Sequence, residues 1–147
     1  MRLHVISVGK PKLLFAKEGW REYERRLRSS CHFEFSHVKV GPTQDREGER
    51  VLERAGNAWC VVCDERGTSV TSRELAGKLQ QWKELALSEV AILIGGADGH
   101  AEAVKDRADW TWSLGPLTLQ HELALIVVLE QLYRAQTILA GSPYHRD

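Results

Sequence analysis

Val90-Ala-Ile-Leu-Ile-Gly-Gly-Ala-Asp-Gly99 is the stretch of this chain that decides its fold. The five apolar residues Val90–Ile94 are typical of a short strand buried on both faces, as in a parallel sheet. Three glycines follow within five residues, and glycines allow positive φ and a close approach of a ligand to the backbone. The pattern has neither the dinucleotide spacing nor the Lys-Ser/Thr of a P-loop. It therefore indicates either a ligand-binding turn or a plain tight turn.

Strand-like and helix-like patterns alternate on both sides of this stretch. We expect strands at Arg2–Val8, His32–Val40, Ala58–Asp64, Val90–Ile94 and Trp110–Ser113, and a short extended piece at Leu117–Leu119. We expect helices at Leu13–Arg28, Gln44–Ala55, Thr71–Leu87, Ala101–Ala108 and Glu122–Leu139. This alternation predicts one domain of the α/β class over residues 1–147, with a mostly parallel sheet flanked by helices.

Three segments should meet at one edge of such a sheet. Ligands of open α/β sheets bind beyond the carboxyl ends of the strands, which brings together Cys63–Gly67, Gly95–Gly99 and Ser113–Gln120. Gly67 is expected to turn the chain after the third strand. The last segment could present main-chain groups to an adenine edge against an apolar wall. An ordinary strand-to-helix connection is the alternative.

The charges of the chain cancel in sum but not by position. Its 147 residues hold 20 Lys and Arg against 20 Asp and Glu, which by itself argues against a nucleic-acid binder. Residues 1–30, however, hold eight basic residues and three acidic ones. Lys17, Arg21, Arg25 and Arg28 recur at helical spacing and form one basic stripe. The stripe is either a solvated helix face or a surface that follows RNA phosphates.

Cysteine usage and hydrophobic runs predict a cytoplasmic protein without a membrane span. The chain opens on a strand pattern rather than a signal peptide, and the most apolar run, Leu123–Leu129, is too short to cross a bilayer. Three cysteines make no disulfide framework. Cys60 and Cys63 lie in an apolar run with no second pair of zinc ligands. We expect them to be structural and expect no metal.

Two features near the C-terminus are unusual. Leu123–Leu129 is apolar on every side, which predicts a helix buried all round, either deep in the fold or against a second copy. The tail, Pro143-Tyr-His-Arg-Asp147, places an aromatic ring, an imidazole and a guanidinium in consecutive positions. That combination suits contact with a base or a phosphate, whereas a frayed polar end is the alternative.

Taken together, these motifs resemble a known family over essentially the whole chain. The family is that of the bacterial SPOUT-superfamily methyltransferases that methylate N3 of a pseudouridine in large-subunit (23S) ribosomal RNA. The resemblance is carried by Met1-x-Leu-x-Val-Ile-x-Val-Gly-Lys10, Glu22-Tyr-x-x-Arg-Leu27, Asp64-x-x-Gly67, Thr71-Ser-x-Glu-Leu-Ala76, Leu93-Ile-Gly-Gly-x-x-Gly99, Trp112-Ser-Leu114, Leu117-Thr-Leu-x-His121, Leu129-Glu-Gln-Leu-Tyr-Arg-Ala135 and Pro143-Tyr-His-Arg146.

The resemblance implies an α/β fold with a C-terminal trefoil knot, a homodimer, and S-adenosylmethionine as cofactor. By motif, the cofactor contacts fall at Cys63, Gly95, Gly96, Gly115, Pro116, Leu117, Thr118, Leu119 and Gln120. The family usually has Pro where this chain has Gln120, an aliphatic residue at Cys63, and often Arg where this chain has Leu125.

The resemblance also implies that Tyr144, His145 and Arg146 reach the target base near the partner subunit's cofactor. The substrate implied by the resemblance is ribosomal RNA, on the ribosome. The RNA contacts that we expect are Lys17, Arg21, Arg25 and Arg28. An imide nitrogen must lose its proton when it is methylated. His145 as a base and Arg146 as a stabiliser of negative charge are equal candidates for that task.

Two other functions fit parts of the pattern. A phosphoacceptor signalling domain would use Asp64, but it needs acidic residues where this chain has Gly9-Lys10, and a Lys where it has Gly95-Gly96. A small nucleotide- or flavin-binding domain without catalysis is the other alternative.

Overall fold

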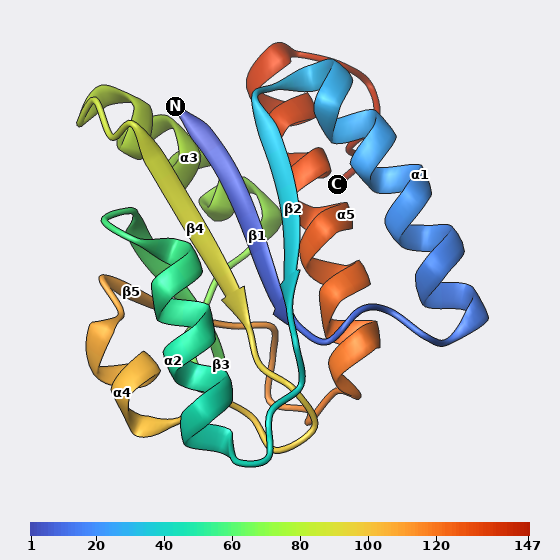
Figure 1. The fold of residues 1–147 in the computed structure, drawn as a ribbon. Coiled ribbons are helices and arrows are strands. Elements are labelled where there is room, and N and C mark those ends of the chain that lie inside the picture. Colours follow the sequence, from blue (N-terminus) through green and yellow to red (C-terminus); the bar gives the residue numbers. More distant parts are fainter.

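The computed structural model describes residues 1–147 as a five-stranded sheet with five helices (Figure 1). The elements are β1 (Arg2–Val8), α1 (Leu14–Ser30), β2 (Phe33–Val38), α2 (Gln44–Ala55), β3 (Trp59–Ser69), α3 (Ser72–Glu84), β4 (Glu89–Ile94), α4 (Glu102–Arg107), β5 (Trp110–Ser113) and α5 (His121–Ala140). The predicted α/β class and the predicted order of elements are confirmed.

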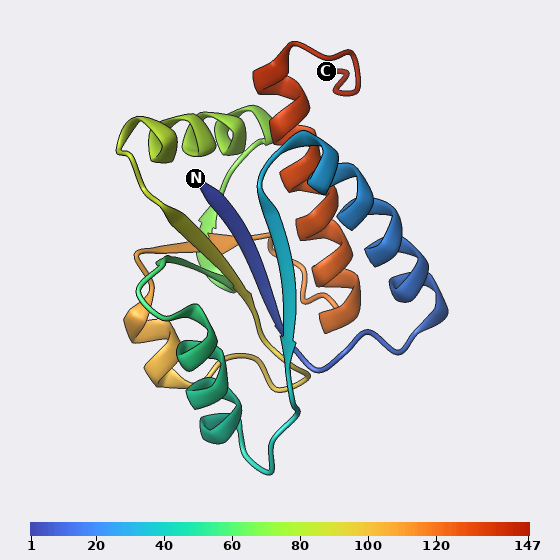
Figure 2. The ribbon, with the colours of Figure 1, turned by 45° about the horizontal axis from the view of Figure 1, so that its top comes forward.

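The sheet has the order β2-β1-β4-β3-β5, and all of its strand pairs are parallel. Val5 of β1 pairs with Phe35 on one side and with Ile92 on the other, and Ile92 also pairs with Val61. β4 is therefore the central strand, and five of its six residues are buried. β1, β2 and β4 end at the same edge, and the loops that follow them gather there (Figures 1 and 2).

Helices cover both faces of the sheet because successive strand residues point to opposite faces. Leu3 and Val5 of β1 belong to the larger core cluster, which packs against α1, α3 and α5. Ile6 and Val8 belong to the smaller cluster, which packs against α2 and α4. Figures 1 and 2 show α2 and α4 on one side of the sheet and α5 and α1 on the other.

The prediction that Gly67 turns the chain is wrong. β3 continues to Ser69, and its register against β5 shifts between Cys63 and Thr68. The intervening residues bulge out of the ladder, so the strand resumes instead of ending. Gly67 is needed there for close contact, because an added Cβ would lie 2.5 Å from the carbonyl oxygen of Thr111.

Two further boundaries differ from those expected. The Thr71–Glu74 capping box is present, but α3 ends at Glu84 rather than Leu87 because Ala86 takes a left-handed conformation with φ of 58°. Leu117–Leu119 forms no strand and belongs to the loop between β5 and α5.

α5 packs on the sheet between α1 and α3. By length and composition it could cross a membrane, but core helices of folded domains pass the same test. The expected burial on every side is wrong for a single chain. Leu125, Val128 and Leu129 are buried, whereas Leu123 is 40% exposed and Ile126 is half-buried. An apolar strip of α5 is therefore left uncovered. The trefoil knot stays a prediction.

The three cysteines carry free thiols. Cys60 and Cys63 are three residues apart on β3, so their side chains point to opposite faces of the sheet. Cys60 packs in the smaller cluster and Cys63 against the larger one. Cys60 is fully buried, as expected of a cysteine that packs in the core.

Candidate active site

A pocket of about 370 Å³ opens beside the bulge of β3 and the carboxyl ends of β4 and β5. Its lining comes from the three segments that the sequence brings together, namely Cys63–Arg66, Ile94–His100, and the loop from Leu114 to His121. The walls therefore combine the β3 bulge, the glycine turn after the central strand, and the loop that leads into α5. The expectation that these three segments meet is confirmed.

The glycine turn holds its shape because two of its residues cannot carry a side chain. A Cβ on Gly95 would lie 2.9 Å from the carbonyl carbon of Gly99. Gly99 has φ of 77°, and its N–H donates to the carbonyl of Gly96 at 3.0 Å. The turn closes on itself, and Gly95 and Gly96 present bare backbone to the pocket.

The loop before α5 forms the opposite wall. Gly115 has φ of 127°, and the Ser113 hydroxyl bonds both its N–H and its carbonyl. The Thr118 hydroxyl donates to Glu65 at 2.7 Å, which ties this loop to the β3 bulge. Leu114, Leu117 and Leu119 supply an apolar lining.

Two of the nine predicted cofactor residues lie outside the pocket lining. Pro116 is exposed at the loop tip. The side chain of Gln120 accepts hydrogen bonds from the N–H groups of Glu122 and Leu123, so it caps α5. A proline could not make this cap, which gives a physical reason for Gln at this position. The other seven predicted residues, Cys63, Gly95, Gly96, Gly115, Leu117, Thr118 and Leu119, line the pocket.

The pocket also contains polar groups that are not among the predicted cofactor residues. Asp64 is 3.8 Å from the Lys105 ammonium, and both line the pocket. His100 is buried, and its Nε2–H donates to the carbonyl of Leu93 at 3.0 Å. Burial lowers the pKa of His100 and raises the pKa of Cys63 to about 12. His100 and Cys63 are therefore neutral at pH 7. Among these groups, only Asp64 had a signal in the sequence, because it is the last residue of the predicted strand Ala58–Asp64.

The C-terminal tail packs against α5. The Tyr144 hydroxyl donates to Glu130 at 3.0 Å and lies 3.3 Å from the Tyr23 hydroxyl. Its ring packs edge-on against Tyr133. Burial, followed by these hydrogen bonds, raises the pKa of Tyr144 above its ordinary value, so the phenol is neutral.

The other two tail residues differ in exposure. His145 is largely buried, and it contacts Arg134 and Asp147. Arg146 is exposed and makes no ion pair. The predicted tail residues are therefore held at one place, with the guanidinium of Arg146 left available.

The tail and the pocket lie at opposite ends of α5 within one chain. His121 at the start of α5 lines the pocket, whereas the tail follows Ala140 at its other end. Twenty helical residues span about 30 Å. Figures 1 and 2 show the C-terminus far from the carboxyl edge of the sheet. A single chain thus does not bring Tyr144, His145 and Arg146 to its own pocket.

The predicted basic stripe lies on α1, with all four members exposed. Arg25 pairs with Glu22 and Arg28 with Glu24 on the same helix. Lys17 and Arg21 make no ion pair. The stripe therefore divides into a free half near the start of α1 and a half already neutralised by acidic neighbours.

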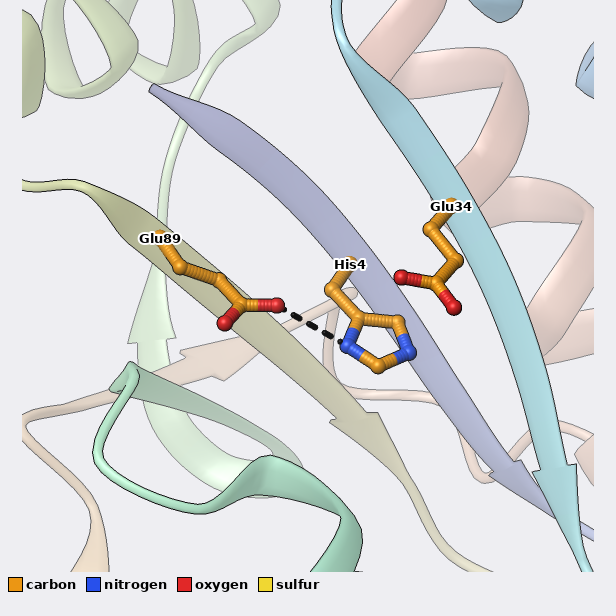
Figure 3. A group of neighbouring side chains, drawn as sticks. All are labelled: His4, Glu34 and Glu89. Atoms are coloured by element: carbon orange, nitrogen blue, oxygen red, sulfur yellow. Dashed lines mark hydrogen bonds and ion pairs between the residues drawn. The ribbon is translucent and has the colours of Figure 1, made fainter.

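A second cluster of possible metal ligands lies at the amino ends of the strands. Figure 3 shows His4 between Glu89 and Glu34, with a hydrogen bond of 3.0 Å from its Nδ1 to Glu89. Arg2 bonds both carboxylates, at 2.6 Å to Glu89 and 2.7 Å to Glu34. The Nε2 of His4 contacts the Ser36 hydroxyl at 2.8 Å. Because the Arg2 guanidinium already neutralises the charge of the two carboxylates, a metal ion would have to displace it. We interpret the cluster as an ion-pair network.

Known proteins match both the sequence and the fold. A family model described as "Predicted SPOUT methyltransferase" matches residues 1–145. The Ribosomal RNA large subunit methyltransferase H of Deinococcus radiodurans is 47% identical over 146 residues, covering 99% of each chain. The protein of the same name from Thermus thermophilus is 48% identical over 146 residues, also covering 99% of each chain.

Solved structures with little sequence identity share the fold. The tRNA (m1G37) methyltransferase from Aquifex aeolicus has a TM-score of 0.59 at 15% identity, covering 100% of this chain and 76% of that chain. A probable methylase family protein from Haemophilus influenzae has a TM-score of 0.60 at 14% identity, covering 99% of this chain and 70% of that chain. Since the family model and the relatives match nearly the full length, the chain belongs to the SPOUT methyltransferase family.

Proposed function

We propose that this protein methylates N3 of a pseudouridine in 23S ribosomal RNA, on assembled ribosomes in the cytoplasm, with S-adenosylmethionine as methyl donor. The observation that carries the proposal is the pocket beside the β3 bulge and the carboxyl ends of β4 and β5, which is lined by the motifs on which the resemblance to the family rests. The relatives named as ribosomal RNA methyltransferases support the substrate class.

The residues of the pocket fit S-adenosylmethionine. Its volume of about 370 Å³ is within the range of small-molecule sites, roughly 300–1,000 Å³. Leu114, Leu117 and Leu119 offer an apolar wall for an adenine ring, and the bare backbone of Gly95 and Gly96 allows close approach. When bound, this cofactor supplies an already activated methyl group on a sulfonium.

The uncovered apolar surface supports a homodimer. Leu13, Leu14, Phe15 and Leu123 are 40–70% exposed. They form one patch, because Glu122 accepts hydrogen bonds from the N–H groups of Lys12 and Leu13 and so holds the start of α1 beside the start of α5. Large exposed apolar patches mark association sites. We propose that this patch is covered by a second copy.

A dimer of this kind can complete the active site. If a twofold axis reverses α5, the C-terminal end of each α5 lies toward the N-terminal end of the partner's α5, where the partner's pocket opens. Tyr144, His145 and Arg146 then face a cofactor held by the other subunit. This arrangement gives a role to a tail that its own pocket does not use.

The chain's own residues then have defined tasks. Positioning of the base against the methyl group is the main one, and it can supply roughly 7–11 kcal/mol in well-oriented systems. The imide nitrogen loses its proton as it is methylated, so the site must stabilise the resulting negative charge or accept the proton. Arg146, exposed and unpaired, is suited to that negative charge or to a phosphate. Lys17 and Arg21 are suited to flanking phosphates.

The direct test is transfer of tritiated methyl groups to ribosomes from a strain that lacks the protein. Wild-type protein should label 23S ribosomal RNA, and a variant that lacks Tyr144–Asp147 should remain a folded dimer, bind the cofactor, and transfer no methyl group. Unchanged turnover by this variant would remove the tail from the mechanism.

Calorimetry separates the proposal from a non-catalytic nucleotide- or flavin-binding domain. S-adenosylmethionine should bind to the folded dimer and flavin mononucleotide should not. The reverse result would contradict the proposed cofactor.

A further inference from the structure

Arg134 connects α5 to the imidazole of the tail. Its Nε and Nη2 donate to the same carboxylate oxygen of Glu130, at 3.0 and 2.7 Å. The remaining Nη1 lies 3.1 Å from Nδ1 of His145. The Tyr144 hydroxyl donates to that oxygen of Glu130 as well, and the Arg134 guanidinium lies over the Tyr144 ring. Glu130 and Arg134 therefore anchor two consecutive tail residues.

These contacts determine where His145 carries its proton. A guanidinium has only donors, so Nδ1 must be the acceptor and carries no hydrogen. Nε2 lies 3.0 Å from a carboxylate oxygen of Asp147. The two hydrogen bonds from Arg73, and to a lesser degree the hydrogen bond from His145, lower the pKa of Asp147 to about 2. This carboxylate is therefore ionised and accepts the hydrogen bond from Nε2. The single hydrogen of the neutral imidazole is thus on Nε2.

We propose that Arg134 and Glu130 are positioning residues that present His145 to the substrate as the neutral Nε2–H tautomer, a hydrogen-bond donor and not a base. The inference rests on the proposed function for its catalytic consequence only. Because Nδ1 is engaged by Arg134, it has no free lone pair for the N3 proton. That proton is released to water instead.

The substrate group that replaces Asp147 follows from the same geometry. Nε2–H now donates to an anionic oxygen. Both carbonyl oxygens next to an imide nitrogen gain negative charge when N3 loses its proton. A donor fixed in advance toward such an oxygen stabilises that charge without reorganisation. His145 and Arg146 then share one task, the stabilisation of the imidate.

The tautomer is measured directly by two-bond ¹H–¹⁵N spectra of the full-length protein labelled at histidine nitrogens. The chain has six histidines, and a His145→Gln variant identifies the signal of His145. We expect a pyridine-type Nδ1 and a pyrrole-type Nε2 in the wild-type protein near neutral pH. A pyrrole-type Nδ1, or a charged ring with two protonated nitrogens, would overturn the proposal.

Variants of Arg134 test whether Arg134 fixes the tautomer of His145. Arg134→Met removes the donor, and His145 should become a mixture of both tautomers. Arg134→Lys keeps a donor, and the Nε2–H tautomer should persist, which covers the case in which the Met variant does not fold. Arg26→Met is the matched control, because Arg26 also lies over tyrosine rings of this region but does not contact His145. A wild-type spectrum for folded Arg134→Met would contradict the proposal.

Methyl-transfer kinetics test whether this positioning of His145 matters for catalysis. Arg134→Met should lower kcat roughly 10–100-fold, as expected when a reacting group is misplaced by about an ångström. The dissociation constant of S-adenosylmethionine should stay unchanged, and Arg134→Lys should recover part of kcat. Equal kcat for the Met variant and wild type would overturn the positioning role. If wild-type protein transfers no methyl group, the proposed function fails, whereas the tautomer measurement still decides the assignment of His145.

Discussion

Gly95 is the residue at which local geometry and the proposed chemistry are most tightly linked. The position follows the last residue of the central strand and folds back against Gly99. The three atoms nearest to a side chain there would all be backbone atoms of Gly99, and backbone cannot move aside as a flexible side chain can. The turn that lets a ligand reach the strand end is thus specified by the absence of a Cβ.

We predict that Gly95→Ala weakens S-adenosylmethionine binding about tenfold or more, because the turn must open to relieve about 1–3 kcal/mol of overpacking. Isothermal titration calorimetry measures the affinity. Gly77→Ala is the control, since Gly77 lies in α3 with open space around it. That variant should bind normally and be more stable by about 0.5–1 kcal/mol. Normal binding by Gly95→Ala would show that the turn does not contact the cofactor.

Two buried histidines predict how stability depends on pH. Burial lowers the pKa of both His4 and His100 in the folded protein. The unfolded chain takes up these protons near pH 6.5, so the free energy of unfolding should fall as the pH drops below about 6.5. Each histidine should lower the free energy of unfolding by up to about 1.4 kcal/mol for each pH unit below about 6.5, until the pH reaches its pKa in the folded protein.

Urea unfolding between pH 7.5 and 5 measures this dependence. His100→Gln should flatten the curve, whereas His32→Gln, at an exposed position, should leave its slope unchanged. A stability that rises on acidification over this range would contradict the direction of both pKa shifts.

At the scale of elements, α1 carries a prediction about the RNA surface. Lys17→Gln with Arg21→Gln should weaken ribosome binding more than Arg25→Gln with Arg28→Gln, because acidic neighbours already pair with the second pair. Each lost phosphate contact should reduce the salt dependence of log K by about 0.7–0.9. Binding measured at several salt concentrations checks this. Equal effects of the two pairs, or a loss of cofactor affinity, would argue against a phosphate-contacting stripe.

Most elements were predictable because local patterns determine them. The apolar run of β4 and the capping box of α3 depend on residues close in sequence, and both appear where expected. Gly67 was predicted wrongly because its role is set by a non-local contact with Thr111. The glycine signature located the pocket, but the Arg134 donor to His145 comes from α5 and could not be placed without the fold.

At the scale of the whole molecule, the apolar patch predicts the state of association. The double variant Leu14→Glu with Phe15→Glu should convert the dimer to a folded monomer. Leu14 is 70% exposed in the single chain, so a charged side chain there should hardly change the stability of the monomer. Sedimentation equilibrium measures the mass. The monomer should keep the pocket and lose methyl transfer. A dimer that persists in this variant would place the interface elsewhere.

Mixed dimers test whether the site is shared between subunits. One subunit carries Gly95→Ala and the other lacks Tyr144–Asp147. At a concentration of S-adenosylmethionine that fills the wild-type pocket but leaves the Gly95→Ala pocket mostly empty, each homodimer should show little activity. A mixture should recover activity, because one of the two sites in a mixed dimer combines an intact pocket with an intact tail. No recovery in a mixture shown to exchange subunits would contradict a site shared between subunits.

The most direct test of the proposed function is mass spectrometry of 23S ribosomal RNA from a strain that lacks this protein. We expect one pseudouridine to lack a methyl group at N3, and expression of the wild-type chain to restore it. Expression of the chain without Tyr144–Asp147 should not restore it. An unchanged set of methylated pseudouridines in the deletion strain would contradict the proposed function.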